Sequence, residues 1–68
     1  DPEAALDAYA RVLELYPDDP AAPTALFRAA QVEADRGNDE RAEDMLRQVI
    51  SAYPDSPEAE QAEEVLRG

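Results

Sequence analysis

The chain has 68 residues, which allows one small domain at most and only a modest hydrophobic core. It carries 17 Asp and Glu against six Arg and no Lys, a formal net charge of −11, which argues against nucleic acid or an anionic membrane surface as a partner. It has no His and no Cys, which excludes histidine as a general base, thiol nucleophiles and disulfides, and leaves carboxylates as the groups on which catalysis would have to rest. No apolar run approaches the roughly 18 residues of a membrane-spanning helix.

Residues 1–16 form the first predicted helix. Asp1 precedes Pro2, an arrangement typical of an N-cap followed by the first helical residue, and Pro17 stops the helix. One face carries apolar side chains at helical spacing, namely Leu6, Tyr9, Ala10, Leu13 and Tyr16. Because the chain begins with Asp1 and not with Met, we take it to be a fragment or a mature segment of a longer protein.

A second helix is predicted from about Pro20 to Arg36. Its inward face is narrow and made of small residues, which suits close approach by flanking helices: Ala22, Ala25, Leu26, Ala29 and Ala30. Asp19 and Pro20 suit the cap and the first helical position, but Pro23 disfavours helical geometry at the residue before it. The sequence therefore leaves open whether the regular helix begins at Pro20 or near Pro23.

Capping residues, glycine and proline mark where the third and fourth predicted helices begin and where the third ends. Gly37 closes the second helix, Asn38 is the predicted N-cap of the third, and Pro54 ends the third. The apolar stripe of the third helix consists of Ala42, Met45, Leu46, Val49, Ile50 and Tyr53. Ser56 and Pro57 start the fourth helix, whose buried stripe is predicted at Ala59, Ala62, Val65 and Leu66.

An internal repeat links these helices. The stretch from Tyr16 to Ala22 reads YPDDPAA, and the stretch from Tyr53 to Ala59, 37 positions later, reads YPDSPEA. A period of this size, with prolines between alanine-rich helical segments, is typical of a helical solenoid, in which stacked helix pairs bury a shared face. We therefore predict an all-α fold of about four helices arranged as antiparallel hairpins, with Tyr16 and Tyr53 packed under the turns.

The segment from Ala25 to Pro57 resembles a tetratricopeptide repeat. Ala30 stands at the small-residue position of that family, Ala42 at its alanine position and Pro54 at its closing proline. Glu33 and Leu46 stand where the family usually carries aromatic residues. The resemblance implies an antiparallel α–α superhelix.

The resemblance also implies how the chain is divided: residues 1–16 are the second helix of a truncated repeat, 20–53 are one complete repeat, and 57–68 are the first helix of the next. The ending YPDSPEA looks like a subgroup found in bacterial envelope proteins, notably the periplasmic coordinator of the Tol-Pal system and the outer-membrane assembly lipoproteins. This likeness implies a role in a cell-envelope assembly and a periplasmic or outer-membrane-associated location, with a cytoplasmic location as the alternative.

In the resembling family the first helix of each repeat lines a concave groove that binds an extended or helical peptide. Carried over by position, the candidate groove residues are Thr24, Phe27, Gln31, Asp35, Gln61 and Glu64. Phe27 has two interpretations: it anchors an apolar side chain of the ligand, or it packs against Leu6, Tyr9 or Leu13 of the preceding helix. We expect a non-catalytic interaction module with a protein or peptide partner, without catalytic residues, cofactor or metal site.

The alternative function is structural. Apolar stripes at the two ends of the chain, from Leu6 to Tyr16 and from Ala59 to Leu66, have no neighbouring repeat, and uncapped solenoid ends favour self-association. Arg28 and Arg36 are candidates for binding an acidic partner, although in so acidic a chain we expect internal carboxylates to neutralise both.

Overall fold

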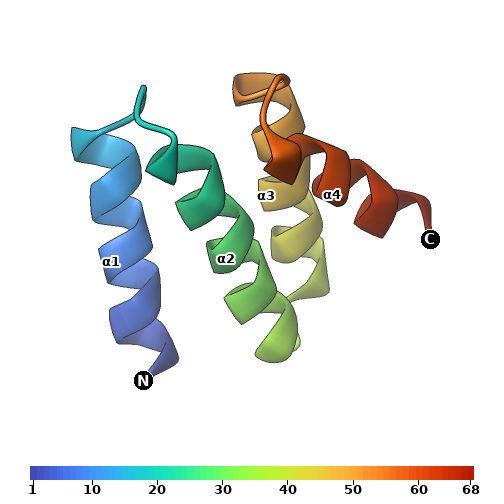
Figure 1. The fold of residues 1–68 in the computed structure, drawn as a ribbon. Coiled ribbons are helices and arrows are strands. Elements are labelled where there is room, and N and C mark those ends of the chain that lie inside the picture. The colour runs from blue at the N-terminus through green and yellow to red at the C-terminus, as the bar shows by residue number, and fades with distance from the viewer.

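The structure, a computed structural model, describes residues 1–68 and contains four α-helices and no strand. The helices are α1 (Pro2–Leu15), α2 (Ala21–Asp35), α3 (Asp39–Ala52) and α4 (Pro57–Arg67). Successive helices run in opposite directions; α2 packs between α1 and α3, and α4 packs against α3 and α2 (Figure 1). The predicted all-α fold of antiparallel hairpins is confirmed. None of the four helices has the length and apolar composition that a membrane crossing needs.

The core is made mainly of alanine. Seven of its ten buried apolar residues are alanines, and Leu26, Leu46 and Val49 are the larger three. The small-residue face predicted for the second helix is buried throughout. Because alanine side chains are short, the helix axes can approach closely. The core is then held by many van der Waals contacts between small groups rather than by a few large side chains.

Local hydrogen bonds explain where α1 and α4 begin. The Asp1 carboxylate accepts a hydrogen bond from the Glu3 backbone N–H at 3.0 Å, and the Ser56 hydroxyl accepts one from the Ala59 N–H at 3.1 Å. Ser56 also donates its hydroxyl proton to the Tyr53 carbonyl at 2.7 Å. Each cap is followed by a proline at the first helical position, as predicted.

The structure shows where α2 begins relative to Pro23, a point that the sequence left open. The helix begins at Ala21, and the Asp19 carboxylate accepts a hydrogen bond from the Ala21 N–H at 2.9 Å. Pro23 is the third helical residue, where the backbone N–H has no acceptor within the helix, so its ring removes no helical hydrogen bond. The helix therefore begins before Pro23 and continues through it.

In the turn between α2 and α3, Gly37 acts as predicted, whereas the Asn38 side chain does not. Gly37 has a φ of 83°, a left-handed conformation that favours glycine at the end of a helix. Asn38 is the N-cap residue of α3, but its side chain does not cap that helix. Instead its amide donates to the Glu33 carboxylate at 3.0 Å, which ties the turn to the helix that precedes it.

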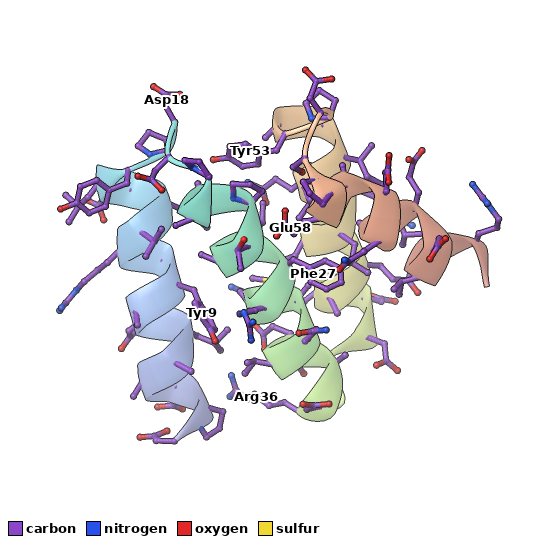
Figure 2. The ribbon with its side chains drawn as sticks, viewed as in Figure 1. Tyr9, Asp18, Phe27, Arg36, Tyr53 and Glu58 are labelled. Carbon is purple, nitrogen blue, oxygen red and sulfur yellow. The ribbon has the colours of Figure 1, made fainter.

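The two Tyr-Pro turns are not equivalent. Tyr53 is half-buried, packs against the core and borders a hollow shared with Asp19, Pro20 and Pro23, which form the first turn and the start of α2 (Figure 2). Tyr16 is 60% exposed. The expectation that both tyrosines pack under a turn is right for Tyr53 and wrong for Tyr16, which none of the turns in the structure covers.

Candidate functional site

Two neighbouring hollows on the α2 side of the molecule contain most of the predicted groove residues. The first hollow lies between α2 and α4 and is lined by Thr24, Phe27, Arg28, Gln31, Glu58 and Gln61. Four of the six predicted residues are thus brought together. Arg28 and Glu58 belong to the same surface and were not predicted for it.

Thr24 has a partner within the chain. Its hydroxyl donates to the Glu58 carboxylate at 2.6 Å, and both residues are half-buried. This bond joins α2 to α4 and fixes the width of the first hollow at one end. Thr24 and Glu58 lie 34 positions apart on different helices, so no local spacing in the sequence identifies the pair.

Arg28 is an exposed cation on the first hollow, and it makes no ion pair. The expectation that internal carboxylates neutralise both Arg28 and Arg36 is therefore wrong for Arg28. Arg36 does pair, with Glu33 at 3.4 Å and with Glu3 at 4.0 Å. Glu58 lines the first hollow together with Arg28, but its carboxylate is hydrogen-bonded to Thr24.

Phe27 lies between α2 and α4 (Figure 2) and borders both hollows. It is half-buried and packs against the core cluster that includes Leu26, Ala30 and Leu46. The hollows that it borders are formed with α3 and α4, and no residue of α1 lines either of them. One part of the ring therefore contributes to the core while another part remains accessible.

The second hollow lies between α2, α3 and the end of α4 and has a volume of about 270 Å³. Buried Ala30, Ala42 and Leu46 line its base, and Phe27 and Val65 contribute apolar walls. The remaining lining residues are Gln31, Ala34, Asp39 and Glu43. The lining is thus mainly apolar, with two carboxylates on the α3 side.

The last two predicted groove residues lie elsewhere. Asp35 is exposed and borders a separate hollow against α1, together with Pro2, Ala5 and Val32. Glu64 is exposed on α4 and lines neither of the two hollows around Phe27. The structure therefore does not bring Asp35 and Glu64 together with the other four.

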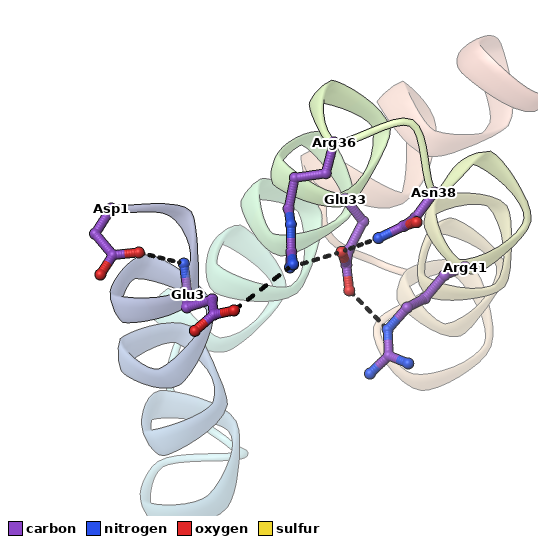
Figure 3. Close-up of polar contacts among 6 residues, drawn as sticks. All are labelled: Asp1, Glu3, Glu33, Arg36, Asn38 and Arg41. Atoms are coloured by element: carbon purple, nitrogen blue, oxygen red, sulfur yellow. Dashed lines mark hydrogen bonds and ion pairs between the residues drawn. The ribbon is translucent and has the colours of Figure 1, made fainter.

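Glu33 forms a buried polar centre at the turn between α2 and α3 (Figure 3). It is 3% exposed, and one carboxylate oxygen accepts hydrogen bonds from Asn38 at 3.0 Å and from Arg36 at 3.4 Å, while the other forms an ion pair with the Arg41 Nε at 2.7 Å. Partners on both oxygens offset the cost of burying this charge. Glu33 therefore has a structural role, joining α2 to α3 where the resembling family has an aromatic residue.

The two hollows present groups that can bind a ligand. No group of three or more carboxylates lies in a position to hold a metal ion, and no buried side-chain polar atom lacks a hydrogen-bond partner. The accessible groups on the two hollows include an aromatic ring, two amides, one guanidinium and the carboxylates of Asp39 and Glu43. Such groups suit recognition of a polypeptide by apolar contact and hydrogen bonds.

The chain was compared with known proteins. A model of the tetratricopeptide repeat family matches residues 1–66. Neither the curated proteins nor the solved structures gave a match. The family match includes both Tyr-Pro turns and all but the last two residues.

Proposed function

Because the chain belongs to the tetratricopeptide repeat family, we propose that it is a non-catalytic module that binds a peptide or a partner helix on its α2 and α4 surface. Repeats of this family generally mediate protein–protein interaction. The observation that supports this surface most directly is Phe27, a half-buried aromatic ring at the junction of two hollows. A ring held by the core on one side and open on the other is a suitable anchor for a ligand's apolar side chain.

The polar groups around Phe27 favour a polypeptide ligand. Gln31 and Gln61 are exposed on the first hollow and offer amide donors and acceptors to a peptide backbone. Arg28 offers a guanidinium that has no carboxylate partner in the chain. A ligand with an apolar side chain and a nearby carboxylate or carbonyl would satisfy all three kinds of group.

Peptides selected from a random library against the folded chain test this proposal. We expect Phe27→Ala to weaken the binding of selected peptides at least tenfold, because interface aromatics often contribute more than about 1.4 kcal/mol. Arg11→Ala, on the exposed part of α1, is the matched control and should leave binding unchanged. The far-UV helical signal must be retained in both variants.

Equal binding by Phe27→Ala and by the original chain would contradict the proposal. Loss of the helical signal would show Phe27 to be essential to the core, and Gln61→Ala, an exposed change on the same hollow, then provides the test. If Gln61→Ala also leaves binding unchanged, the ligand surface lies elsewhere.

We propose self-association as a second function, favoured by the exposed end of α1. Leu15 is 63% exposed and Tyr16 is 60% exposed, and they are adjacent. The other end is less apolar than the sequence suggested, because Ala59 and Ala62 are already buried and Val65 is the large apolar residue exposed there. We therefore place the self-association surface on α1.

Sedimentation equilibrium over a range of chain concentrations tests self-association. We expect species heavier than the 7.5 kDa monomer, in larger amounts at high salt, because salt screens the repulsion between chains of net charge −11. Leu15→Ser combined with Tyr16→Ser should reduce association, and Ala10→Ser is the exposed control on the same helix. A 7.5 kDa species alone at high concentration would rule association out.

The division of the chain into repeats and its location are also proposals. We interpret residues 1–16 as the second helix of one repeat, 20–53 as a complete repeat and 57–68 as the first helix of the next, which is supported by the 37-residue register. The YPDSPEA ending supports a bacterial cell-envelope assembly as the setting. Fractionation of the source cells, followed with an antibody against this chain, should place it in the periplasm or with the outer membrane; recovery from the cytoplasm would favour the alternative.

A further inference from the structure

Another hollow lies between the two Tyr-Pro turns, and we call it the turn hollow. Residues 18–20 and 52–56 line it together with Pro23, and its volume is about 300 Å³. In Figure 2 the Tyr53 side chain extends from the second turn toward the first, and Asp18 lies at the tip of the first turn. The turn hollow shares no lining residue with the two hollows around Phe27, so it is a separate surface.

Equivalent hydrogen bonds hold the two walls of the turn hollow. In the first turn the Asp19 backbone N–H donates to the Tyr16 carbonyl at 3.2 Å, and in the second turn the Ser56 N–H donates to the Tyr53 carbonyl at 3.1 Å. The two bonds are 37 positions apart, and each turn has a helix before it and after it. Because each wall is held by its own bonds, a ligand does not have to order either turn, which favours binding.

Proline rings and one aromatic ring form the apolar part of the turn hollow. Pro20, Pro23 and Pro54 line it beside Tyr53. Pro23 is buried, and Tyr53 is half-buried and packs against the core, so this part of the lining is well anchored. A volume at the lower limit of the roughly 300–1,000 Å³ of small-molecule sites suits one long side chain that can lie along these rings.

Carboxylates border the turn hollow on both sides. Asp18 and Asp55 are exposed and occupy the same register position, one on each turn. Neither makes a side-chain hydrogen bond or an ion pair within the chain. None of the six arginines lines the turn hollow. The chain thus supplies no cation there, and charge complementarity favours a cationic ligand.

We propose that the turn hollow binds an arginine side chain from a basic segment of a partner protein. The methylene groups of the arginine lie on the proline rings, the guanidinium stacks on the accessible part of the Tyr53 ring, and Asp18 and Asp55 neutralise its charge. Arginine is favoured over lysine because its planar group can stack on a ring and donate to carboxylates at the same time. This surface is additional to the proposed peptide site on α2 and α4 and does not depend on it.

NMR titration with short peptides tests the inference. The probe is a capped peptide with one arginine among glycine and serine residues, and in matched peptides citrulline or lysine replaces the arginine. We expect the arginine peptide to shift the ring signals of Tyr53 and the amide signals of Asp18 and Asp55 in a saturable manner. The citrulline peptide has the same shape without the charge and should bind roughly fivefold more weakly. The lysine peptide should also bind more weakly than the arginine peptide, and high salt should weaken both.

Variants of the two turn aspartates place the site. Asp18→Asn combined with Asp55→Asn should weaken binding of the arginine peptide roughly fivefold, because both walls lose their charge while the core is untouched. Asp7→Asn combined with Asp35→Asn is the matched control, since it changes the net charge equally at exposed residues that do not line the turn hollow, and it should weaken binding much less.

Variants of Tyr53 test the aromatic contact. Tyr53→Leu should weaken binding of the arginine peptide, whereas Tyr53→Phe, which keeps the ring, should leave binding unchanged. All variants must retain the far-UV helical signal. If Tyr53→Leu does not retain it, the comparison of the two aspartate pairs decides.

The outcomes separate this inference from the proposed function. Equal binding of the arginine and citrulline peptides, or equal losses in the two aspartate pairs, would overturn it, because attraction to an acidic chain would then explain the binding. Shifts at Phe27 and Gln61 in place of Tyr53 would overturn this site and leave the α2 and α4 surface as the peptide site. Shifts at Tyr53 on concentrating the chain alone would assign the turn hollow to a second copy and overturn the partner. Phe27→Ala should leave binding of the arginine peptide unchanged, so either proposal can fail without the other.

Discussion

α1 and α3 occupy equivalent places in the 37-residue register, yet they are buried very differently. α3 contributes Ala42, Leu46 and Val49 to the core, whereas α1 has no fully buried residue. Both helices carry an apolar stripe, and Val12 and Val49 are the same residue at the same register position. The difference is that α3 packs against α2 and α4, while α1 packs against α2 alone. In a solenoid, burial is therefore set by the number of neighbouring helices as much as by the stripe itself.

The matched valines provide the strongest test of this comparison. We expect Val49→Ala to lower the free energy of unfolding by about 2 kcal/mol, because Val49 is 0% exposed and its methyl groups leave a cavity. Val12→Ala, at a half-buried position, should cost less than about 1 kcal/mol. Chemical denaturation measures both changes, and equal costs would show that α1 is as well packed as α3.

The Glu33 centre is the second difference between the two helices, since it ties α3 to α2 and has no buried counterpart on α1. Glu33→Gln puts an amide N–H₂ among cationic donors and should cost about 2 kcal/mol, within the range for hydrogen bonds to charged groups. Glu40→Gln, at an exposed carboxylate without an ion pair, is the control and should change stability little. A Glu33→Gln cost as small as the control's would contradict a structural role for this residue.

The capping residues of the two Tyr-Pro turns provide the test with the smallest expected effect. Ser56 caps α4 through both a donated and an accepted hydrogen bond, whereas Asp19 accepts one bond at the start of α2. We expect Ser56→Ala to cost about 1 kcal/mol, typical of a lost helix cap, and Asp19→Ala to cost less because its bond is local and exposed. Thermal unfolding of the two variants measures the difference, and a larger loss from Asp19→Ala would reverse this ranking of the turns.

The sequence predicted the helices well because prolines and capping residues mark their ends. The four observed helices begin and end within about two residues of the expected positions, apart from the entry of α2, which Pro23 left open. The alanine face of α2 was also predictable, since helical spacing alone brings these residues to one side.

Several features needed the tertiary arrangement. Glu33 and Arg41 lie eight positions apart across a turn, so the geometry of Gly37 decides whether they meet. The positions of Arg28 and Glu58 on one hollow depend on how α4 is rotated against α2. Tyr16 was misjudged for a related reason, because side chains equivalent in the repeat are buried only where a neighbouring turn covers them.

The lack of a fully buried residue on α1 also has a consequence for motion. Local opening costs least where few apolar groups are removed from water, so α1 is expected to unfold transiently more often than the hairpin of α2 and α3. Amide hydrogens should therefore exchange with solvent fastest in α1. The helix that presents Leu15 and Tyr16 is thus also the helix whose backbone we expect to be protected least.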